Sequence, residues 1–186
     1  MDISKIAKKY DVEFYIKVLL FKNNSNFGVY HDIGHYLSVI SNVEKYCVIE
    51  KFDDKVTRNL IIASIFHDFN RLSSRTDDEN TKNAIEGFIR HSIENKTDNF
   101  LISTILINLE SESDEIYGIT NKLYGKAISL LKSINLIGVY LDCDANDVIQ
   151  YIMKLSHEKS VDLDTCIRGE INLIENYKCK IKSVID

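Results

Sequence analysis

The chain contains no proline and only seven glycines in 186 residues. The strands of a multi-stranded β protein are separated by turns, and turns depend heavily on these two residue types. Without them, nothing in the sequence marks the repeated chain reversals that a sandwich or barrel needs. The composition therefore predicts an all-α fold, in which long helices are joined by short polar loops.

Hydrophobic side chains recur at helical spacing along most of the chain. We expect one compact domain over residues 1–186, a bundle of about seven to nine helices in which the C-terminal helices 148–186 pack on a core of about 28–150. A break is expected near Tyr10 and Asp11, where Asp11 could cap the next helix. The predicted helices cover residues 3–21 with this break, about 30–46, 54–69, 81–91, 98–109, 121–141, 148–155 and 161–185.

The charge and hydropathy of the chain exclude several classes of partner. Hydrophobic residues make up 45% and charged residues 27%, and the net charge is −5. This negative balance argues against a surface for extended nucleic acid. No apolar run approaches the ~20 residues that span a bilayer, and residues 1–10 lack the apolar stretch of a signal peptide. We expect a cytoplasmic protein with no membrane partner.

The four cysteines are Cys47, Cys143, Cys166 and Cys179, and they form no CxxC pair. Wide spacing without such a pair is typical of structural thiols in a reducing compartment. We therefore expect reduced and mostly buried cysteines.

Three of the five histidines, His31, His35 and His67, lie in the first part of the chain. His31 and His35 are four positions apart, and on a helix this spacing places both imidazoles on one face with their Cβ atoms ~5–6 Å apart. Such a pair suits a metal or phosphate site. Two surface histidines would show the same spacing, so the pair alone does not decide between these interpretations.

The His67-Asp68 pair follows the apolar run from Leu60 to Phe66. At helical spacing His67 continues the stripe of Leu60 and Ala63, and Asp68 continues the neighbouring stripe. Both polar side chains should therefore point into the core, where a charge is unfavourable unless it is paired or bound to a metal. A self-contained carboxylate–histidine pair is the alternative, but the apolar setting favours metal ligands.

A further carboxylate would have to come from far along the chain. Asp144 lies on the same helical stripe as Leu130, Ile134, Ile137 and Leu141, whereas Asp142 lies on a different stripe with Asn135 and Gly138. Periodicity thus favours Asp144 over Asp142. Two neutral imidazoles and two carboxylates would neutralise a divalent cation and leave positions open for water.

Four segments resemble those of HD-domain phosphohydrolases, which include cyclic-nucleotide phosphodiesterases and small bacterial and phage proteins. The first, Tyr30 to Val39, resembles Tyr-His-x-x-x-His-x-x-x-Val. The others are residues 63–68 with the family's His-Asp pair, residues 78–84 with its Glu-Asn segment, and residues 141–145 with its late Ala-Asp element. The resemblance covers residues 30–148 in the family's order.

The resemblance implies an HD-type helical bundle that acts as a metal-dependent phosphohydrolase. It implies His35, His67, Asp68 and Asp144 as metal ligands, and His31 and Asp68 as catalytic residues. His31 would donate a proton to the leaving group, a role suited to a side chain that titrates near neutral pH.

The segment after His-Asp departs from the pattern of many two-metal members. These have His-Asp-x-x-His, whereas Arg71 stands at the last position here. The departure indicates one ion per chain, and the guanidinium could instead bind substrate phosphate. Tyr30, Arg75 and Lys82 are further candidates for the substrate pocket. His157 lies among charged residues and is expected at the surface.

We expect metal-activated water and a histidine general acid to hydrolyse a phosphate ester or anhydride in a small nucleotide-like molecule, such as a (deoxy)nucleoside mono- or triphosphate. The alternatives are a cyclic mono- or dinucleotide phosphodiesterase and a non-catalytic HD module that retains its metal and binds a nucleotide or a protein. Mixed nitrogen and oxygen ligands are compatible with Mn, Fe, Co, Ni, Zn or Mg. The sequence leaves open whether the chain forms a homo-oligomer.

Overall fold

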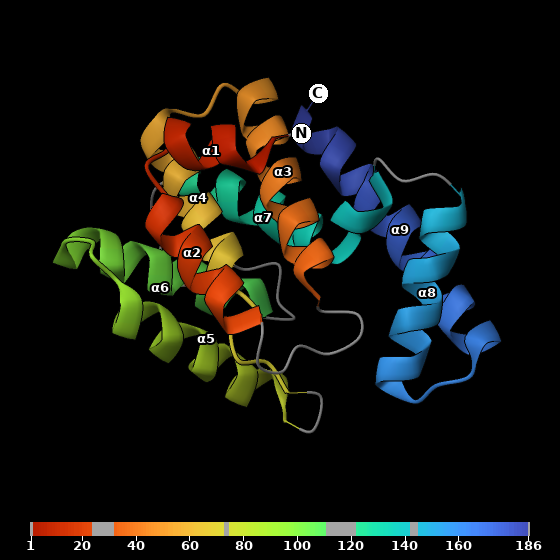
Figure 1. The fold of residues 1–186 in the computed structure, drawn as a ribbon. Helices are drawn as coiled ribbons and strands as arrows, with labels where there is room; N and C mark the ends of the chain where they lie inside the picture. Colours follow the sequence, from red (N-terminus) through yellow and green to blue (C-terminus); the bar gives the residue numbers. More distant parts are fainter. Residues whose placement is uncertain (1, 24–31, 73–74, 111–121, 142–144, 186) are drawn as a thin grey trace.

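A computed structural model describes residues 2–23, 32–72, 75–110, 122–141 and 145–185 (Figure 1). Within these ranges the chain forms nine α-helices and no strand, which confirms the predicted all-α bundle. None of the described helices is long and apolar enough to cross a membrane. The helices are α1 (Ile3–Lys9), α2 (Glu13–Asn23), α3 (Ile33–Ile49), α4 (Asp54–Phe66), α5 (Asp77–His91), α6 (Lys96–Glu110), α7 (Lys122–Leu141), α8 (Ala145–Lys159) and α9 (Leu163–Ile185).

The start of α3 differs from the prediction. Asp32 has an extended backbone, and its Oδ1 accepts a hydrogen bond of 3.1 Å from the His35 N–H, so the helix begins at Ile33 rather than near Tyr30. Aspartate is a preferred N-cap because its carboxylate satisfies an N–H that the helix leaves unpaired. The predicted start of this helix near Tyr30 is therefore wrong, and the predicted placement of His31 beside His35 on one helix face stays a prediction. Tyr30 and His31 themselves lie outside the described residues.

Capping explains a second difference as well. Thr76 and Glu79 form a capping box, in which each side chain accepts from the backbone N–H of the other, so α5 begins at Asp77, four residues earlier than predicted.

The predicted break between α1 and α2 is confirmed, but Asp11 does not cap α2, which begins at Glu13. With a φ of 52°, Asp11 instead occupies the left-handed region in the turn between these helices.

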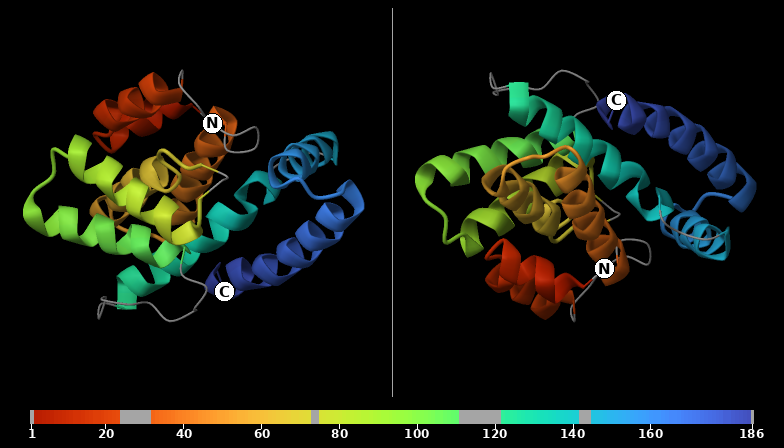
Figure 2. Two further views of the ribbon diagram at one scale, coloured as in Figure 1. Left: turned by 90° about the horizontal axis from the view of Figure 1, so that it is seen from below. Right: turned by 90° about the horizontal axis from the view of Figure 1, so that it is seen from above.

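Helix α4 is buried on all sides over its last two turns. Every residue from Asn59 to Phe66 is buried, and α2, α3, α5, α6 and α7 all contact this helix. Figure 2 shows α4 between the N-terminal helices, the α5–α6 pair and α7. A helix that is apolar all round belongs in a protein interior. The C-terminal end of α4 therefore carries His67 and Asp68 into the middle of the bundle.

Helices α8 and α9 form a smaller apolar cluster beside this core. Ile152, Leu155 and Cys166 are buried together there, and α9 packs against α7. Figures 1 and 2 show the pair on the side of the bundle away from α5 and α6. Lys154 of α8 also forms an ion pair of 2.8 Å with Asp32, which ties the pair to the start of α3. The assignment of the whole chain to one domain stays a prediction.

Two of the four cysteines agree with the expectation of buried, reduced thiols. Cys47 and Cys166 are buried and free. Burial raises the pKa of the Cys47 thiol to about 12, so this side chain is un-ionised at neutral pH. Cys143 and the side chain of Cys179 lie outside what the structure describes.

Phe69 packs the turn after α4 against α5. Its buried ring lies 5.1 Å from that of Phe66, between ring centroids, and directly over Gly87 of α5. A Cβ atom on Gly87 would fall 2.2 Å from Cδ1 of Phe69. Any side chain at position 87 would therefore displace Phe69, and Phe69 follows His67 and Asp68 directly in the chain.

We expect Gly87→Ala to lower the free energy of unfolding by about 1–3 kcal/mol, because the new methyl group overpacks the contact with Phe69. Gly169→Ala is the matched control, since nothing lies within 4 Å of a Cβ at that helical position. It should stabilise the protein by up to ~1 kcal/mol through helix propensity alone. Urea unfolding followed by circular dichroism measures both, and equal effects of the two changes would contradict the packing assigned to Gly87.

Candidate metal centre

His35 reaches the interior from the first turn of α3. Its side chain is buried, and the Asp32 cap that starts the helix also fixes the His35 backbone through the 3.1 Å hydrogen bond to its N–H. The second oxygen of Asp32, Oδ2, accepts from Lys154 at 2.8 Å. Both oxygens of one carboxylate thus hold the start of α3, and with it the position of the imidazole.

His67 is the C-cap of α4, directly after Phe66, and one hydrogen bond sets which ring nitrogen carries its hydrogen. Its Nδ1 lies 2.7 Å from the carbonyl oxygen of Ser64. A carbonyl can only accept, so Nδ1 carries the hydrogen and donates it. In the neutral ring, Nε2 then presents a lone pair. A backbone contact of this kind is the usual way in which a metal-binding histidine is oriented.

Asp68 is held through its backbone by Tyr36. The buried Tyr36 hydroxyl donates a hydrogen bond of 2.7 Å to the Asp68 carbonyl oxygen. Burial and, next, the nearby Asp68 charge raise the pKa of Tyr36 well above its usual value, so the phenol keeps its proton and remains a donor. The turn that carries Asp68 is thereby anchored to α3, one residue after His35.

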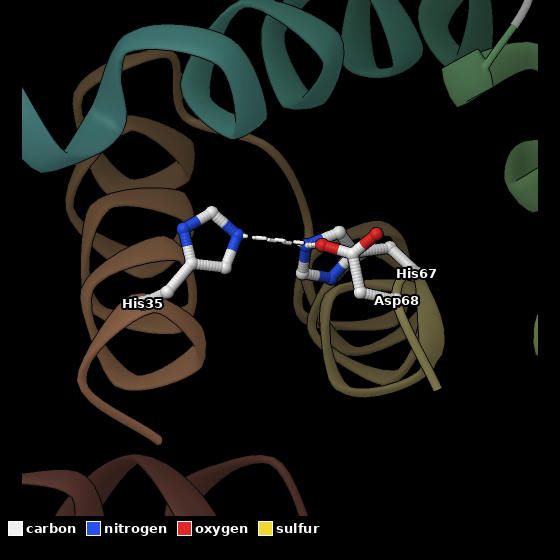
Figure 3. A group of neighbouring side chains, drawn as sticks. All are labelled: His35, His67 and Asp68. Carbon is white, nitrogen blue, oxygen red and sulfur yellow. Dashed lines mark hydrogen bonds and ion pairs between the residues drawn. The ribbon is translucent and has the colours of Figure 1, made fainter. Parts of the chain in front are cut away.

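Three donor atoms converge between α3 and the end of α4. The distances are 3.1 Å between Nε2 of His35 and Nε2 of His67, 2.9 Å between Nε2 of His67 and Oδ2 of Asp68, and 3.5 Å between Nε2 of His35 and Oδ2 of Asp68. The residues are only 2–3% exposed. Figure 3 shows both imidazoles and the carboxylate pointing toward one another. Among the described residues this is the one group of histidine, cysteine and acidic side chains arranged to hold a metal ion.

The electrostatics of the three atoms call for a cation between them. Nε2 of His67 and Oδ2 of Asp68 are both acceptors when the ring is neutral and the carboxylate ionised, yet they lie 2.9 Å apart. Acceptors in such contact repel unless a proton or a metal ion lies between them. A proton on one of the imidazoles would relieve this repulsion, and so would a divalent ion bound between the three atoms.

The spacing of the donor atoms also fits a metal ion. Two ligand atoms that each lie ~2.1 Å from one ion, at an angle of 90–109°, are separated by roughly 3.0–3.4 Å. The three distances of 2.9, 3.1 and 3.5 Å are close to this range. The side chains could thus accept an ion with little movement.

Arg71 balances the other oxygen of Asp68. Its Nη1 lies 3.1 Å from Oδ1 of Asp68, and its Nη2 lies 2.9 Å from Oδ1 of Asp77. Asp68 therefore turns one oxygen to the histidines and the other to a guanidinium. The Arg71 side chain remains 23% exposed, so it is the partly accessible cation beside the buried group.

A cavity of about 390 Å³ opens onto this group. His35, Asp68 and Arg71 line one side of it, and α7 contributes Asn135 and Leu136. The remaining wall comes from α8 and α9, including Lys159 and Glu170. A volume of this size suits a small molecule. The C-terminal helices, which the sequence did not connect with the site, thus form part of its enclosure.

The structure brings some of the predicted site residues together and leaves others apart. His35, His67 and Asp68 form one group, as expected of metal ligands, and Arg71 lies beside it. Arg75 and Lys82 are exposed and do not line the cavity. Tyr30, His31, Asp142 and Asp144 fall outside the described residues, so their predicted roles stay predictions.

Sequence reasoning did not single out three residues that support or line the site. Ser64 and Tyr36 orient the ligands, and Asn135 lines the cavity. For Asn135 a signal existed, because it is an amide within the apolar run of residues 130–141. For the other two there was none, since a serine or tyrosine in an apolar helix is common.

Comparison with known proteins adds no assignment. No protein-family model, no curated protein and no solved structure matches this chain. The functional interpretation therefore rests on the site itself and on the sequence segments described above.

Removal of the Tyr36 hydroxyl should loosen the turn that carries Asp68. We expect Tyr36→Phe to lower the free energy of unfolding by about 1–2 kcal/mol, because the Asp68 carbonyl is left buried without its donor. Tyr46→Phe on the same helix is the control, since the Tyr46 hydroxyl bonds to no described residue, and it should change stability by less than ~0.5 kcal/mol. Urea unfolding compares the two, and the assigned role of Tyr36 is rejected if their effects are the same.

Proposed function

We propose that the chain is a metal-dependent phosphohydrolase of the HD type that acts on a nucleotide-like phosphate ester or anhydride. The observation that carries the proposal is the buried convergence of His35, His67 and Asp68, two of which, His35 and Asp68, line a cavity. The same three residues occupy the histidine and His-Asp positions of the segments that resemble HD phosphohydrolases. The side-chain geometry and the sequence motif thus single out the same three residues independently of each other.

The ligand chemistry supports a divalent transition-metal ion. Two imidazole nitrogens and one carboxylate oxygen suit Mn²⁺, Fe²⁺, Co²⁺, Ni²⁺ or Zn²⁺. When bound, such an ion lowers the pKa of a coordinated water and polarises a phosphoryl oxygen. The chain's own part is to hold the ligands: the Ser64 carbonyl fixes the His67 tautomer, and Tyr36 fixes the Asp68 backbone.

Arg71 is the residue that we assign to the substrate phosphate. It lines the cavity beside Asp68, and its guanidinium is partly exposed. A guanidinium presents five N–H donors in a planar fork that matches phosphate oxygens. The enclosed volume of about 390 Å³ supports a mononucleotide-sized substrate rather than an extended polymer.

His31 is proposed as the general acid on the basis of the sequence resemblance. It immediately precedes Asp32, the cap of the helix that carries His35. In this role its imidazolium would give a proton to the leaving oxygen as the phosphorus–oxygen bond breaks. The neutral imidazole that results would regain its proton from solvent.

The first test is metal content. We expect the protein dialysed against Mn²⁺ to retain about one ion per chain and His67→Ala to retain none, because the change removes the nitrogen closest to Asp68. His157→Ala, at an exposed histidine of α8, is the control and should keep the ion. Elemental analysis measures the ion, and a rise in melting temperature with Mn²⁺ should accompany binding to the native state. Stoichiometric metal in His67→Ala would show that the centre is misplaced.

The second test separates chemistry from binding. His31→Ala should keep its metal but lose kcat by roughly 10²–10⁴-fold on the natural type of substrate, the usual contribution of general acid–base assistance. The loss should shrink with p-nitrophenyl phosphate, whose leaving group departs without protonation. Steady-state assays on a panel of nucleoside mono-, tri- and cyclic phosphates provide the comparison, again with His157→Ala as control. Unchanged turnover in His31→Ala would remove the proton-donor role.

A further inference from the structure

We propose that Asn135 of α7 supplies a further, uncharged oxygen ligand to the ion held by His35, His67 and Asp68. The inference rests on the proposed metal centre but not on any hydrolytic activity. It names a residue that neither periodicity nor the family resemblance assigned to the site.

The first observation concerns the side-chain carbonyl of Asn135. Its Oδ1 is buried and has no hydrogen-bond partner among the described residues. A buried polar atom left unsatisfied is unfavourable by about 1–3 kcal/mol, so native proteins rarely keep one without an ion, a water or a ligand nearby. The amide thus needs a partner that is not one of the described side chains.

The second observation is where this oxygen lies. Asn135 lines the same cavity as His35 and Asp68. Helix α7 packs against both α3 and α4, the helices that carry the ligands. Figure 3 shows α7 crossing beside the two histidines and Asp68. The three donor atoms of the proposed centre come from α3 and from the two residues after α4, so α7 is the element placed to add a further ligand.

The third observation is the register of α7. Leu130, Ile134 and Ile137 are buried, so the apolar stripe of the sequence analysis lies in the core, while Asn135 and Leu136 line the cavity. Asp144 was predicted from that apolar stripe, and it follows the end of α7 at Leu141. Leu141 is six residues beyond Asn135, which is ~9 Å along a helix axis. Of the two α7 residues that line the cavity, Asn135 is the one with an atom that can bind a metal ion.

An amide ligand changes the charge of the centre. Two neutral imidazoles, one carboxylate and one amide leave a divalent ion with a net charge of about +1, where a second carboxylate would neutralise it. Carbonyl oxygen is also a ligand suited to Mn²⁺. The centre should therefore hold its ion less tightly than a two-carboxylate site and attract an anion such as phosphate more strongly.

The decisive measurements are Mn²⁺ affinity by isothermal titration calorimetry and the visible absorption of bound Co²⁺. We expect Asn135→Ala to weaken Mn²⁺ binding by at least ~10-fold, the lower end of what supporting groups of metal sites contribute. Asn135→Asp should instead tighten Mn²⁺ binding by ~10-fold, since it adds a charged oxygen at the same place. Both should alter the Co²⁺ spectrum. A gain of affinity in Asn135→Asp cannot come from misfolding, so this variant keeps the test informative if Asn135→Ala folds poorly.

Asn176→Asp is the matched control for charge, because Asn176 is exposed on α9 and does not line the cavity. It should leave Mn²⁺ affinity within ~2-fold of wild type, as expected for a screened surface charge. Asp144→Asn, measured in parallel, tests the aspartate that the sequence resemblance implies as a ligand. A large loss in Asp144→Asn with no effect of either Asn135 variant would overturn the inference in favour of the aspartate.

Other outcomes are equally clear. If the Asn135 variants change the affinity for inorganic phosphate but not for Mn²⁺, the amide binds substrate and the inference is wrong. If the wild-type chain binds neither Mn²⁺ nor Co²⁺, the metal centre and the inference fail together. If metal affinity shifts as expected but no nucleotide is hydrolysed, Asn135 stands as a ligand and the phosphohydrolase proposal fails alone.

Discussion

Burial of α4 on every side is the constraint on which the rest of the structure depends. Its residues from Asn59 to Phe66 are enclosed by five other helices, so their apolar area is removed from water only when the whole bundle has assembled. The helix ends inside the bundle, and the next two residues, His67 and Asp68, are polar. Their burial is tolerable because each is held: His67 by the Ser64 carbonyl, and Asp68 by Tyr36 and Arg71.

The same packing also brings polar atoms of three side chains together in the interior. The α3–α4 contact brings Nε2 of His35 within 3.1 Å of Nε2 of His67, with a carboxylate oxygen 2.9 Å from the latter. A stable core does not need this arrangement, and apolar side chains of similar size would stabilise it at least as well. The convergence of two imidazole nitrogens and one carboxylate oxygen at ion-binding distances is the physical reason for our proposal of a metal centre, and hence of phosphate chemistry.

The cavity depends on the late helices as much as on the early ones. Helices α7, α8 and α9 supply the wall opposite His35 and Asp68, and the Lys154–Asp32 ion pair links this wall to the cap of the ligand-bearing helix. A change in the packing of α8 and α9 would alter the shape of the substrate space without touching a metal ligand. The candidate metal ligands and most of the cavity wall thus come from different parts of the same bundle.

The sequence by itself determined the all-α class, the burial of α4 and the inward direction of His67 and Asp68, because helical periodicity and the absence of proline are local properties. It also singled out His35 through a motif, although it placed the start of α3 too early, because the Asp32 cap begins the helix at Ile33. Only the tertiary structure decided that His35 meets His67 across 32 residues, that Arg71 pairs with Asp68, and that Asn135 lines the cavity. These are contacts between helices, and their geometry depends on how the helices cross, which no periodicity within one helix encodes.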